Sequence, residues 1–323
     1  MRILAVTTPL PTAERPGTMA PTARQIDSLR ALGVQVDVLE VKGVAILKYL
    51  QAIPQQRALL SPVDLIHAHY GYCGWLARNQ FKKPVVVSFM GDDLLGTPDD
   101  NGKLQSCSRV MVRANRQLAR LVGAVIVKSA EMAEVVAPTH AHVVPNGVDM
   151  DQFRPMQRAE ARTLLGWDDD RRYILFAGDP STPRKGFRLA HEAVTRASSR
   201  LAESLSLVPL TGVAPDRVPL YMNGCDFMLM TSFIEGSPNV VKEALACNLP
   251  VVSVPVGDVP ELLVDVGGCA VCPRDAEALA EAITRRLGSR PSCEGRATLK
   301  SKGLDLGSVA QNILDIYQSV LAR

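Results

Sequence analysis

Short apolar runs alternate with helix-like segments along the first half of the chain. Most of the runs are rich in β-branched residues, which is typical of parallel strands buried on both faces of a sheet. Helix-like stretches separate them, such as residues 22–32, which Gly33 closes. Strand–helix alternation of this kind predicts a doubly wound α/β domain. The expected strands are Ile3–Thr7, Val34–Val41, Leu65–His69, Pro84–Phe89, Ala124–Lys128 and His142–Pro145.

The same alternation restarts after Pro145-Asn146-Gly147, whose residue types favour a turn. We therefore expect one domain over residues 1–146 and a second over 147–323, each with a doubly wound parallel sheet. The last helix is free to pack back on the first domain. The expected strands of the second half are 173–177, 205–213, 227–232 and 250–255. Amphipathic patterns predict helices over 275–287, ended by Gly288, and after a cap at Ser308.

Composition fits this picture of two globular domains. The chain has 323 residues, of which 47% are hydrophobic and 21% charged. No run of about 18 apolar residues predicts a membrane span. The first apolar run ends in proline and charges, which favours a strand over a signal peptide. The seven cysteines are irregularly spaced, and only Cys269 and Cys272 form a close pair. We expect reduced thiols, no metal site and a cytoplasmic protein.

Positive charge is concentrated in the first half. Residues 1–146 contain 16 Lys and Arg against 11 Asp and Glu, whereas the net charge of the whole chain is only +3. This balance hints at an anionic partner or a membrane surface, but no nucleic-acid motif accompanies it. Within an expected helix over 106–121, a spacing of four, three and four residues forms a stripe. Its members are Arg109, Arg113, Arg116 and Arg120.

This arginine stripe has two interpretations. It is either an ordinary solvated helix face or a surface that contacts an anionic acceptor or lipid headgroups. The second interpretation predicts peripheral attachment to the inner face of the membrane.

Two carboxylates bracket a helix start in the stretch EGSPNVVKEALACNLPVV, residues 235–252. Ser237 is expected to cap the helix, with Pro238 at its first position. The free N–H groups of a helix start bind anions. Glu235 precedes the helix, and Glu243 lies roughly 9 Å along it from the cap. A diphosphate at the helix start would therefore have a carboxylate on either side for sugar and ribose hydroxyls. Taken singly, each glutamate is also explained as a turn residue or a solvated helix residue.

The pattern Glu235-x7-Glu243, in this setting, resembles the donor-site motif of the retaining, nucleotide-sugar-dependent glycosyltransferases of family 4. Further pieces follow the family's order: IHAH, FMGDDL, PNGVD and RKG. The resemblance implies the GT-B architecture, two Rossmann-like domains facing across a cleft. It also implies a front-face displacement in which the leaving phosphate accepts the acceptor's proton, with neither cofactor nor metal.

In the second domain, the resemblance implies a set of donor contacts. Glu243 would bind the ribose, Glu235 the sugar, and Lys185 with Arg184 the diphosphate. Asp179 stands where the family usually has its first arginine, and a solvated Arg-Lys pair is the alternative for residues 184 and 185. The groups implied to contact phosphate at the helix start belong to Gly236, Ser237, Asn239 and Val240.

In the first domain, several residues fall at expected strand ends, where α/β sheets bind ligands. The resemblance adds Gly17 to the donor or acceptor site, although an ordinary loop glycine is equally plausible. His69 would face the cleft, or be a buried hydrogen-bonded histidine like His67. Lys128 is either an anion contact or a surface lysine.

The segment Met90-Gly91-Asp92-Asp93 departs from the family, many of whose members have histidine where this chain has Met90. A thioether neither titrates nor donates a hydrogen bond. Asp92 and Asp93 remain as groups for acceptor hydroxyls or, with a raised pKa, for a proton. Alternatively, Asp93 caps the next segment and Asp92 is solvated. Gly91 joins them as an acceptor-side candidate.

Two functions compete at this point. The first is a hexosyltransferase that moves a sugar from a nucleoside-diphosphate sugar to a glycan, lipid-linked or small-molecule acceptor, in cell-surface polysaccharide or glycolipid synthesis. The second is a GT-B-like protein that binds nucleotide-sugars without transferring them, which Met90 and Asp179 favour. The sequence leaves the sugar, the base and the acceptor open.

Overall fold

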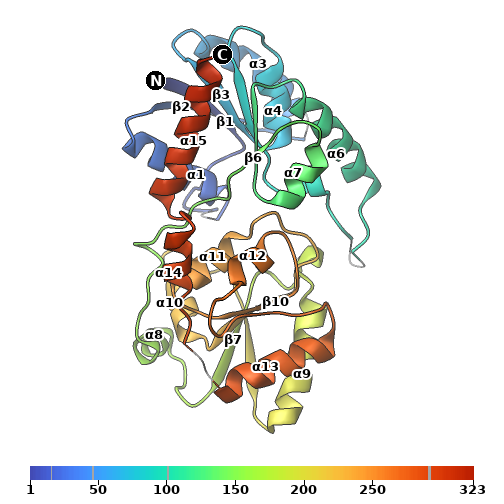
Figure 1. Cartoon of the computed structure of the whole chain (residues 1–323), viewed down its shortest axis with the longest axis vertical. Coiled ribbons are helices and arrows are strands. Elements are labelled where there is room, and N and C mark those ends of the chain that lie inside the picture. Colours follow the sequence, from blue (N-terminus) through green and yellow to red (C-terminus); the bar gives the residue numbers. More distant parts are fainter. Residues whose placement is uncertain (16, 46, 100–101, 290–291) are drawn as a thin grey trace. The chain divides into compact units, whose positions relative to one another are not determined.

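Two parallel sheets organise the chain, one in each of two compact units (Figure 1). The computed structural model describes residues 1–15, 17–45, 47–99, 102–289 and 292–323. The first unit comprises Met1–Thr97, Leu104–Gly147 and Leu306–Arg323, and the second comprises Pro98–Lys103 and Val148–Asp305. The segment Pro98–Lys103 thus groups with the second unit, although the sequence places it in the first domain. In the second unit, a Cβ at Gly102 would lie 3.0 Å from the Phe233 ring, so the segment approaches that ring closely.

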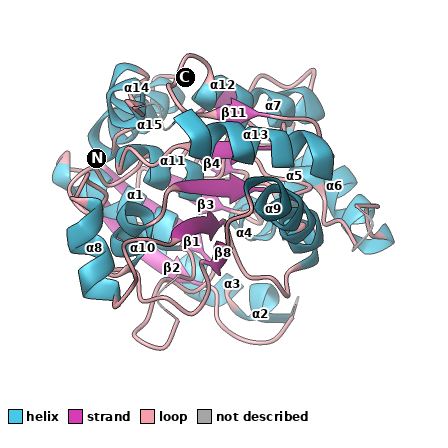
Figure 2. Cartoon of the chain, turned by 90° about the horizontal axis from the view of Figure 1, so that it is seen from below, coloured by secondary structure: helices cyan, strands magenta, loops and turns pink. Residues whose placement is uncertain are grey.

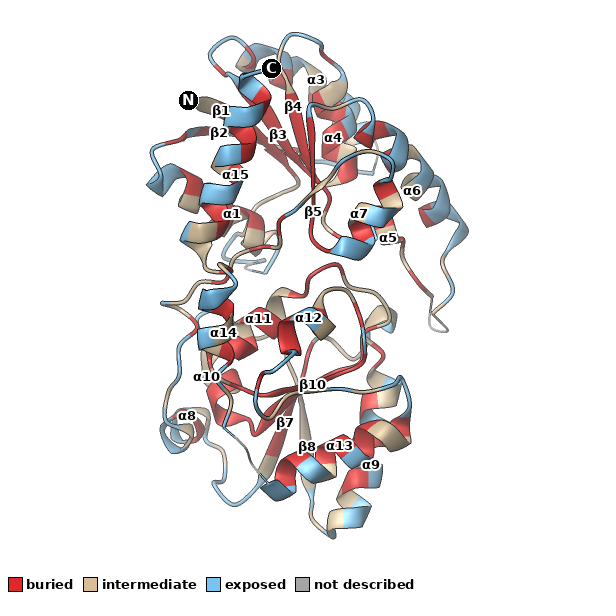
Figure 3. Cartoon of the chain, viewed as in Figure 1, coloured by how far each residue is buried: buried red, intermediate tan, exposed pale blue. Residues whose placement is uncertain are grey.

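The first sheet has six strands in the order β2-β1-β3-β4-β5-β6, and every pair is parallel. The strand order reverses between β1 and β3, which is where such sheets form a ligand crevice. Apart from the edge strands β2 and β6, the strands are almost entirely buried (red in Figure 3). Their bounds are β1 Arg2–Thr7, β2 Gln35–Glu40, β3 Leu65–His69, β4 Val85–Ser88, β5 Ala124–Val127 and β6 His142–Val143.

Helices cover both faces of this sheet. One face packs under α1 and α15, where Ile26 and Leu29 of α1 meet Ile313 and Tyr317 of α15 in one core. These two helices lie side by side (Figure 2). The opposite face forms a second core. The helices of the unit are α1 Ala20–Ala31, α2 Leu47–Gln51, α3 Ile53–Leu59, α4 Gly71–Arg78, α5 Asp92–Leu95, α6 Ser106–Ala119, α7 Ala130–Val136 and α15 Leu306–Leu321.

The second sheet has five strands in the order β11-β10-β9-β7-β8, again all parallel. Its order reverses between β7 and β9. The strands are β7 Arg172–Phe176, β8 Leu205–Pro209, β9 Phe227–Met230, β10 Val251–Ser253 and β11 Ala270–Val271. The helices are α8 Arg158–Leu165, the short η1 Pro183–Lys185, α9 Phe187–Leu201, α10 Val218–Gly224, α11 Asn239–Ala246, α12 Val259–Leu263, α13 Ala276–Ser289 and α14 Gly295–Ser301. The prediction of a doubly wound parallel sheet in each half is therefore confirmed.

Three predicted helix ends are wrong by one to three residues. Helix α11 starts after Pro238, and the Ser237 hydroxyl accepts from the buried Lys242 amine at 2.9 Å instead of capping the helix. Helix α15 starts at Leu306, so Ser308 lies inside it. Helix α13 runs past Gly288 to Ser289, since a single glycine in a last turn costs only about 1 kcal/mol.

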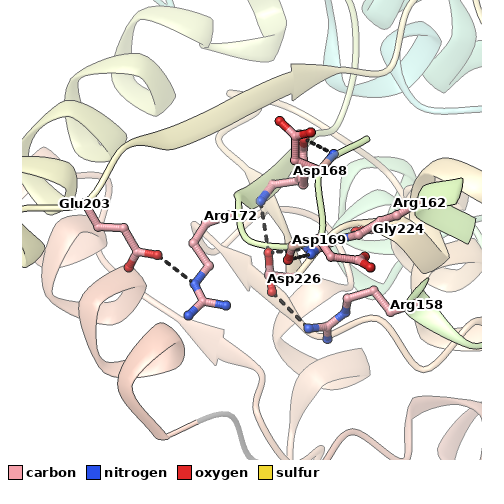
Figure 4. A network of polar contacts seen from close by, with 9 residues as sticks. Arg158, Arg162, Asp168, Asp169, Arg172, Glu203, Gly224 and Asp226 are labelled. Atoms are coloured by element: carbon pink, nitrogen blue, oxygen red, sulfur yellow. Dashed lines mark hydrogen bonds and ion pairs between the residues drawn. The ribbon is translucent and has the colours of Figure 1, made fainter. Parts of the chain in front are cut away.

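A buried ion pair ties α8 to the second sheet (Figure 4). Asp226, just before β9, accepts from the Arg162 guanidinium at 3.1 Å, and both side chains are about 5% exposed or less. Arg158 adds a bond at 3.0 Å from a side chain that is 41% exposed. The Tyr173 backbone N–H donates to the same carboxylate at 2.9 Å. Arg162 also donates to the Gly224 carbonyl oxygen at 2.9 Å, so the charges are fully bonded.

We predict that Asp226→Ala lowers the free energy of unfolding of the second unit by about 3–5 kcal/mol, because it leaves the Arg162 charge buried without its partner. Arg158→Ala is the matched control and should cost no more than about 1 kcal/mol, since its arm of the pair is exposed. Urea unfolding followed by tryptophan fluorescence measures both. If both variants lose the same free energy of unfolding, the buried bond between Asp226 and Arg162 stabilises the unit no more than the exposed bond to Arg158 does.

Candidate active site

Two loops meet where the second sheet reverses its strand order. One follows β7 and runs from Gly178 to Gly186, and the other follows β9 from Thr231. The Thr231 hydroxyl bonds to the carbonyl oxygens of Lys185 at 3.1 Å and Gly186 at 3.0 Å. The Phe233 N–H donates to the Arg184 carbonyl oxygen at 2.8 Å. The backbones of the two loops are therefore fastened together.

Glycine makes this close approach possible at two points. Gly186 has φ +66°, and a Cβ there would lie 2.3 Å from the Thr231 carbonyl oxygen. Gly257, in the loop after β10, has φ +54°, and its Cβ would lie 2.4 Å from the Gly236 carbonyl oxygen. No side chain fits at either distance, so glycine at both positions allows three loops to come into backbone contact.

The two loops also share a charge cluster centred on Glu235. Its Oε1 atom accepts from the Lys185 Nζ atom at 2.6 Å and from the Arg184 guanidinium at 2.9 Å. The Glu235 and Lys185 side chains are only 13% and 14% exposed. Burial acts to raise the pKa of Glu235, but the charges of Lys185 and Arg184 outweigh it and leave that pKa lowered. The structure thus brings together three residues that the sequence proposes for the donor site.

Asp179 does not join this cluster. Its carboxylate accepts from the backbone N–H of Ser181 at 2.8 Å and from the Ser181 hydroxyl at 2.7 Å, and these bonds lower the pKa of Asp179. The neighbouring Gly178 instead gives room to the Lys185 side chain, whose carbons lie 3.1 Å from the place of a Cβ. Asp179, which stands where the family usually has an arginine, therefore makes its hydrogen bonds within its own turn.

Helix α11 starts beside this cluster. No side chain caps its first turn, at Asn239 and Val240, so N–H groups at its start are not occupied by a side-chain cap. Gly236 and Ser237 are buried just before it, and Glu243 is half-buried within it. The candidate residues of the donor motif therefore lie within one short turn-and-helix segment.

Two further residues at this site are missing from the sequence interpretation. Lys242, on α11, is fully buried, and burial lowers its pKa to about 8 although the Asp258 and Glu243 charges oppose the shift. Arg274 donates to the Thr231 carbonyl oxygen at 2.8 Å and to that of Ser232, with its guanidinium 4.5 Å from the centre of the Phe233 ring. A lysine among apolar helix positions was a usable signal for the first, whereas nothing in the sequence marks the second.

In the first unit, the two histidines of β3 are buried and neutral. His67 bonds to the Tyr317 hydroxyl at 2.5 Å and to the Ser88 hydroxyl at 2.8 Å. Burial, with the His69 and Lys128 charges acting in the same direction, lowers the pKa of His67 well below its usual value. Burial and then the Lys128 charge lower the pKa of His69 to about 3. In the described part of the chain, the His69 Nδ1 atom has no hydrogen-bond partner. His67 is thus the buried, hydrogen-bonded histidine that the sequence predicts.

The two adjacent aspartates have different surroundings. Asp93 is fully buried, and its carboxylate accepts from the backbone N–H groups of Met90, Gly91 and Gly71 at 2.9–3.0 Å. Burial raises the pKa of Asp93 to about 7 even so. Its carboxylate therefore fastens the start of α4 to the loop after β4. Asp92 is exposed, with the Tyr70 hydroxyl 3.4 Å from its Oδ2 atom. Of the two, only Asp92 presents a carboxylate to solvent.

The remaining two candidates of the first unit differ in burial. Lys128 is only 1% exposed, and its amine donates to the Val144 carbonyl oxygen at 3.3 Å, which rules out a surface lysine. Gly17 is exposed in the loop after β1, with open space where a Cβ would be. Its place in the donor or acceptor site stays a prediction.

Comparison with known proteins matches both units to glycosyltransferase families. Residues 2–147 match the model described as "Glycosyl transferase 4-like domain", and residues 171–289 match "Glycosyl transferases group 1". The chain belongs to the family 4 glycosyltransferases. The resemblance inferred from the Glu235-x7-Glu243 pattern is thereby confirmed.

Two relatives of this glycosyltransferase are themselves named as glycosyltransferases. It is 26% identical to the putative teichuronic acid biosynthesis glycosyltransferase TuaC of Bacillus subtilis, over 88% of this chain and 89% of the relative. It is 28% identical to a D-inositol 3-phosphate glycosyltransferase of Saccharomonospora viridis, over 80% of this chain and 70% of the relative.

Solved structures show that the glycosyltransferase has the GT-B fold. The sucrose-phosphate synthase of Thermosynechococcus elongatus matches with a TM-score of 0.82 at 17% identity, over 100% of both chains. The Anabaena protein Alr3699/HepE, solved in complex with UDP-glucose, matches with a TM-score of 0.72 at 17% identity, over 99% of this chain and 100% of that one.

Among the residues that the structure describes, no helix has the length and apolar character of a membrane span. Within the same residues, no three His, Cys, Asp or Glu side chains gather in a way that could hold a metal ion.

We predict that Gly186→Ala lowers the free energy of unfolding by about 1–3 kcal/mol more than Gly212→Ala does. Both glycines have φ +66°, so both variants carry the same backbone strain. Only at residue 186 would the new methyl group meet the Thr231 carbonyl oxygen, since nothing lies within 4 Å of the Cβ position at residue 212. Urea unfolding of the two variants gives the difference, and equal losses would contradict the close contact of the loops.

Proposed function

We propose that this glycosyltransferase transfers a sugar from a nucleoside-diphosphate sugar to a hydroxyl group of a glycan or lipid-linked acceptor, with retention and without a metal. One observation carries the proposal. The Glu235 cluster places two cations and a carboxylate beside the start of α11, at the point where the sheet reverses. Cations and helix N–H groups suit a diphosphate, and carboxylates suit sugar hydroxyls.

The donor has one arrangement that uses all of these groups. Its diphosphate binds between Lys185 with Arg184 and the start of α11. Glu243, further along the same helix, then accepts from the ribose hydroxyls, while Glu235 accepts from hydroxyls of the sugar. The complexes of the Anabaena protein with UDP and UDP-glucose support this class of donor.

Transfer in this arrangement needs no protein base. The bond between the anomeric carbon and the phosphate oxygen breaks while the acceptor oxygen bonds to that carbon from the same face. The acceptor's proton passes to the departing phosphate oxygen. Lys185 and Arg184 stabilise the charge that develops on that phosphate, as fixed cations do in other transferases. Breaking the contact of Lys185 with Glu235 on donor binding frees the amine for this role.

The first unit supplies the acceptor side. Asp92 is its exposed carboxylate and accepts from an acceptor hydroxyl, whereas Asp93 positions the loop. The name of the teichuronic acid glycosyltransferase supports an acceptor in cell-surface polysaccharide synthesis, and the name of the D-inositol 3-phosphate glycosyltransferase supports a small phosphorylated acceptor as the alternative. We place the reaction in the cytoplasm, at the inner face of the membrane when the acceptor is a lipid.

A second candidate function is binding of the nucleotide-sugar without transfer. The occupied carboxylate of Asp93 and the thioether at Met90 favour it, because they leave the first unit with few groups for chemistry. Titration calorimetry with nucleotide-sugars, paired with a donor hydrolysis assay, separates the two functions. Binding with neither hydrolysis nor transfer would select the binding protein.

The proposed function is tested first by thermal shift with nucleoside diphosphates and their sugars. A diphosphate that binds the folded protein raises the Tm. We expect one base to raise it most and its sugar conjugate to be slowly hydrolysed. If no nucleoside diphosphate shifts the Tm, the donor site is wrong.

We predict that Glu243→Ala weakens binding of the nucleoside diphosphate by about 1–3 kcal/mol, because two hydroxyl bonds to the ribose are lost. Glu281→Ala removes an exposed helix glutamate of the same unit and should leave the affinity unchanged. Calorimetry measures both affinities. An unchanged affinity in Glu243→Ala would remove this residue from the ribose site.

We predict that Glu235→Gln reduces turnover at least tenfold without weakening binding of the nucleoside diphosphate. The amide loses the charge that orients the sugar, but it also releases Lys185 and Arg184 from a competing carboxylate. Initial rates and calorimetry on the same preparation separate the two effects. Wild-type turnover in this variant would place Glu235 outside the site.

A further inference from the structure

A surface groove of about 620 Å³ lies in the first unit between α5, α6 and α7. These three helices pack against one another (Figure 3). The groove has an apolar lining from Leu94 and Leu95 of α5, Leu104 before α6, and valines of α6 and α7. An apolar hollow of this size at a surface is a place where a ligand can bury alkyl groups.

One wall of the groove belongs to the arginine stripe of α6. Arg109, Arg113 and Arg116 line it, whereas Arg120, the fourth member of the stripe, does not. All four side chains are exposed. In the described part of the chain, none of the three lining arginines forms an ion pair. Three guanidinium groups on one wall, without protein partners, are suited to a phosphate.

The opposite wall carries two carboxylates of α7, Glu131 and Glu134. Burial and then the neighbouring charge of Glu134 raise the pKa of Glu131. In the described part of the chain, no ion pair joins these two glutamates to the arginines of the groove. Carboxylates that face a groove without a cationic partner accept well from sugar hydroxyls.

The groove adjoins the candidate acceptor residue. Helix α5 begins at Asp92 and ends at Leu95, so one four-residue helix carries the exposed carboxylate at its start and lines the groove at its end. A molecule bound in the groove would therefore extend along α5 toward Asp92.

We propose that this groove binds the sugar-phosphate-alkyl portion of a lipid-linked acceptor. The arginine wall takes the phosphate, the glutamate wall takes hydroxyls of the sugar joined to it, and the leucines take the first methylene groups of the chain. The proposal rests on the proposed transferase function and names the acceptor class for it. A flat, charge-driven contact with a membrane surface would use all four arginines alike, and the groove uses three.

The test uses decyl glucosyl phosphate, a phosphodiester of glucose and decanol, kept below its micelle concentration and titrated into the full chain. Inorganic phosphate, glucose 1-phosphate and decyl glucoside each lack part of the structure. We expect the phosphodiester to bind at least tenfold more tightly than any of these three. Equal affinity for glucose 1-phosphate would remove the alkyl site, and equal affinity for decyl glucoside would remove the phosphate site.

Arg113→Gln and Arg120→Gln form a matched pair, since both remove one exposed charge from the same helix. We expect Arg113→Gln to weaken binding of the phosphodiester at least tenfold, and Arg120→Gln to weaken it less than twofold. Equal weakening by the two variants, or equal loss of binding to vesicles with 30% phosphatidylglycerol, would replace the groove by a general membrane contact.

Binding of the nucleoside diphosphate, measured on the same samples, separates this proposal from the transferase function. It should be unchanged in both arginine variants. Nucleotide binding without phosphodiester binding would overturn the groove alone, and the converse result would overturn the donor site alone.

Discussion

The second unit depends on a carboxylate, that of Glu235, held between the Lys185 amine and the Arg184 guanidinium. Strand order places the loops after β7 and β9 next to each other, and the Thr231 hydroxyl and Gly186 bring their backbones into contact. Without the carboxylate, this packing would leave the charges of Lys185 and Arg184 without an opposite charge. The carboxylate offsets one of their two charges, and its pKa is lowered because attraction to the two cations outweighs burial.

The same interaction links the packing of these loops to the proposed binding of the donor. Without a nucleotide, the cations are stabilised by Glu235. A diphosphate offers them more negative charge, and the start of α11 offers it N–H groups, so the donor can replace one set of bonds by another. The glutamate is then available to the sugar. On this account the donor site is kept ready by an internal substitute for the phosphate.

The sequence was informative where a local pattern decides the structure, and silent where tertiary contacts do. Buried parallel strands have a clear apolar pattern, so most strand bounds were predicted to within one or two residues. The exceptions are β8, which ends at Pro209 where the prediction ran to residue 213, and the two-residue β11, which was not predicted. The Glu235-x7-Glu243 pattern located helix α11 because that helix also follows from a local sequence pattern. The cap was missed because buried Lys242 takes the Ser237 hydroxyl, and Arg274 was missed because only the folded sheet brings it to Thr231. Asp93 looked catalytic, yet its carboxylate bonds three backbone N–H groups from two segments.

The account is tested most directly by a double-mutant cycle between Lys185→Met and Glu235→Gln, read as free energies of unfolding. Each single variant leaves its partner's charge partly buried, whereas the double variant removes both charges. We predict that the double variant is more stable than the sum of the single losses implies, by about 1–3 kcal/mol of coupling. Losses that add to within about 0.5 kcal/mol would contradict the claim that this ion pair holds the two loops of the donor site together.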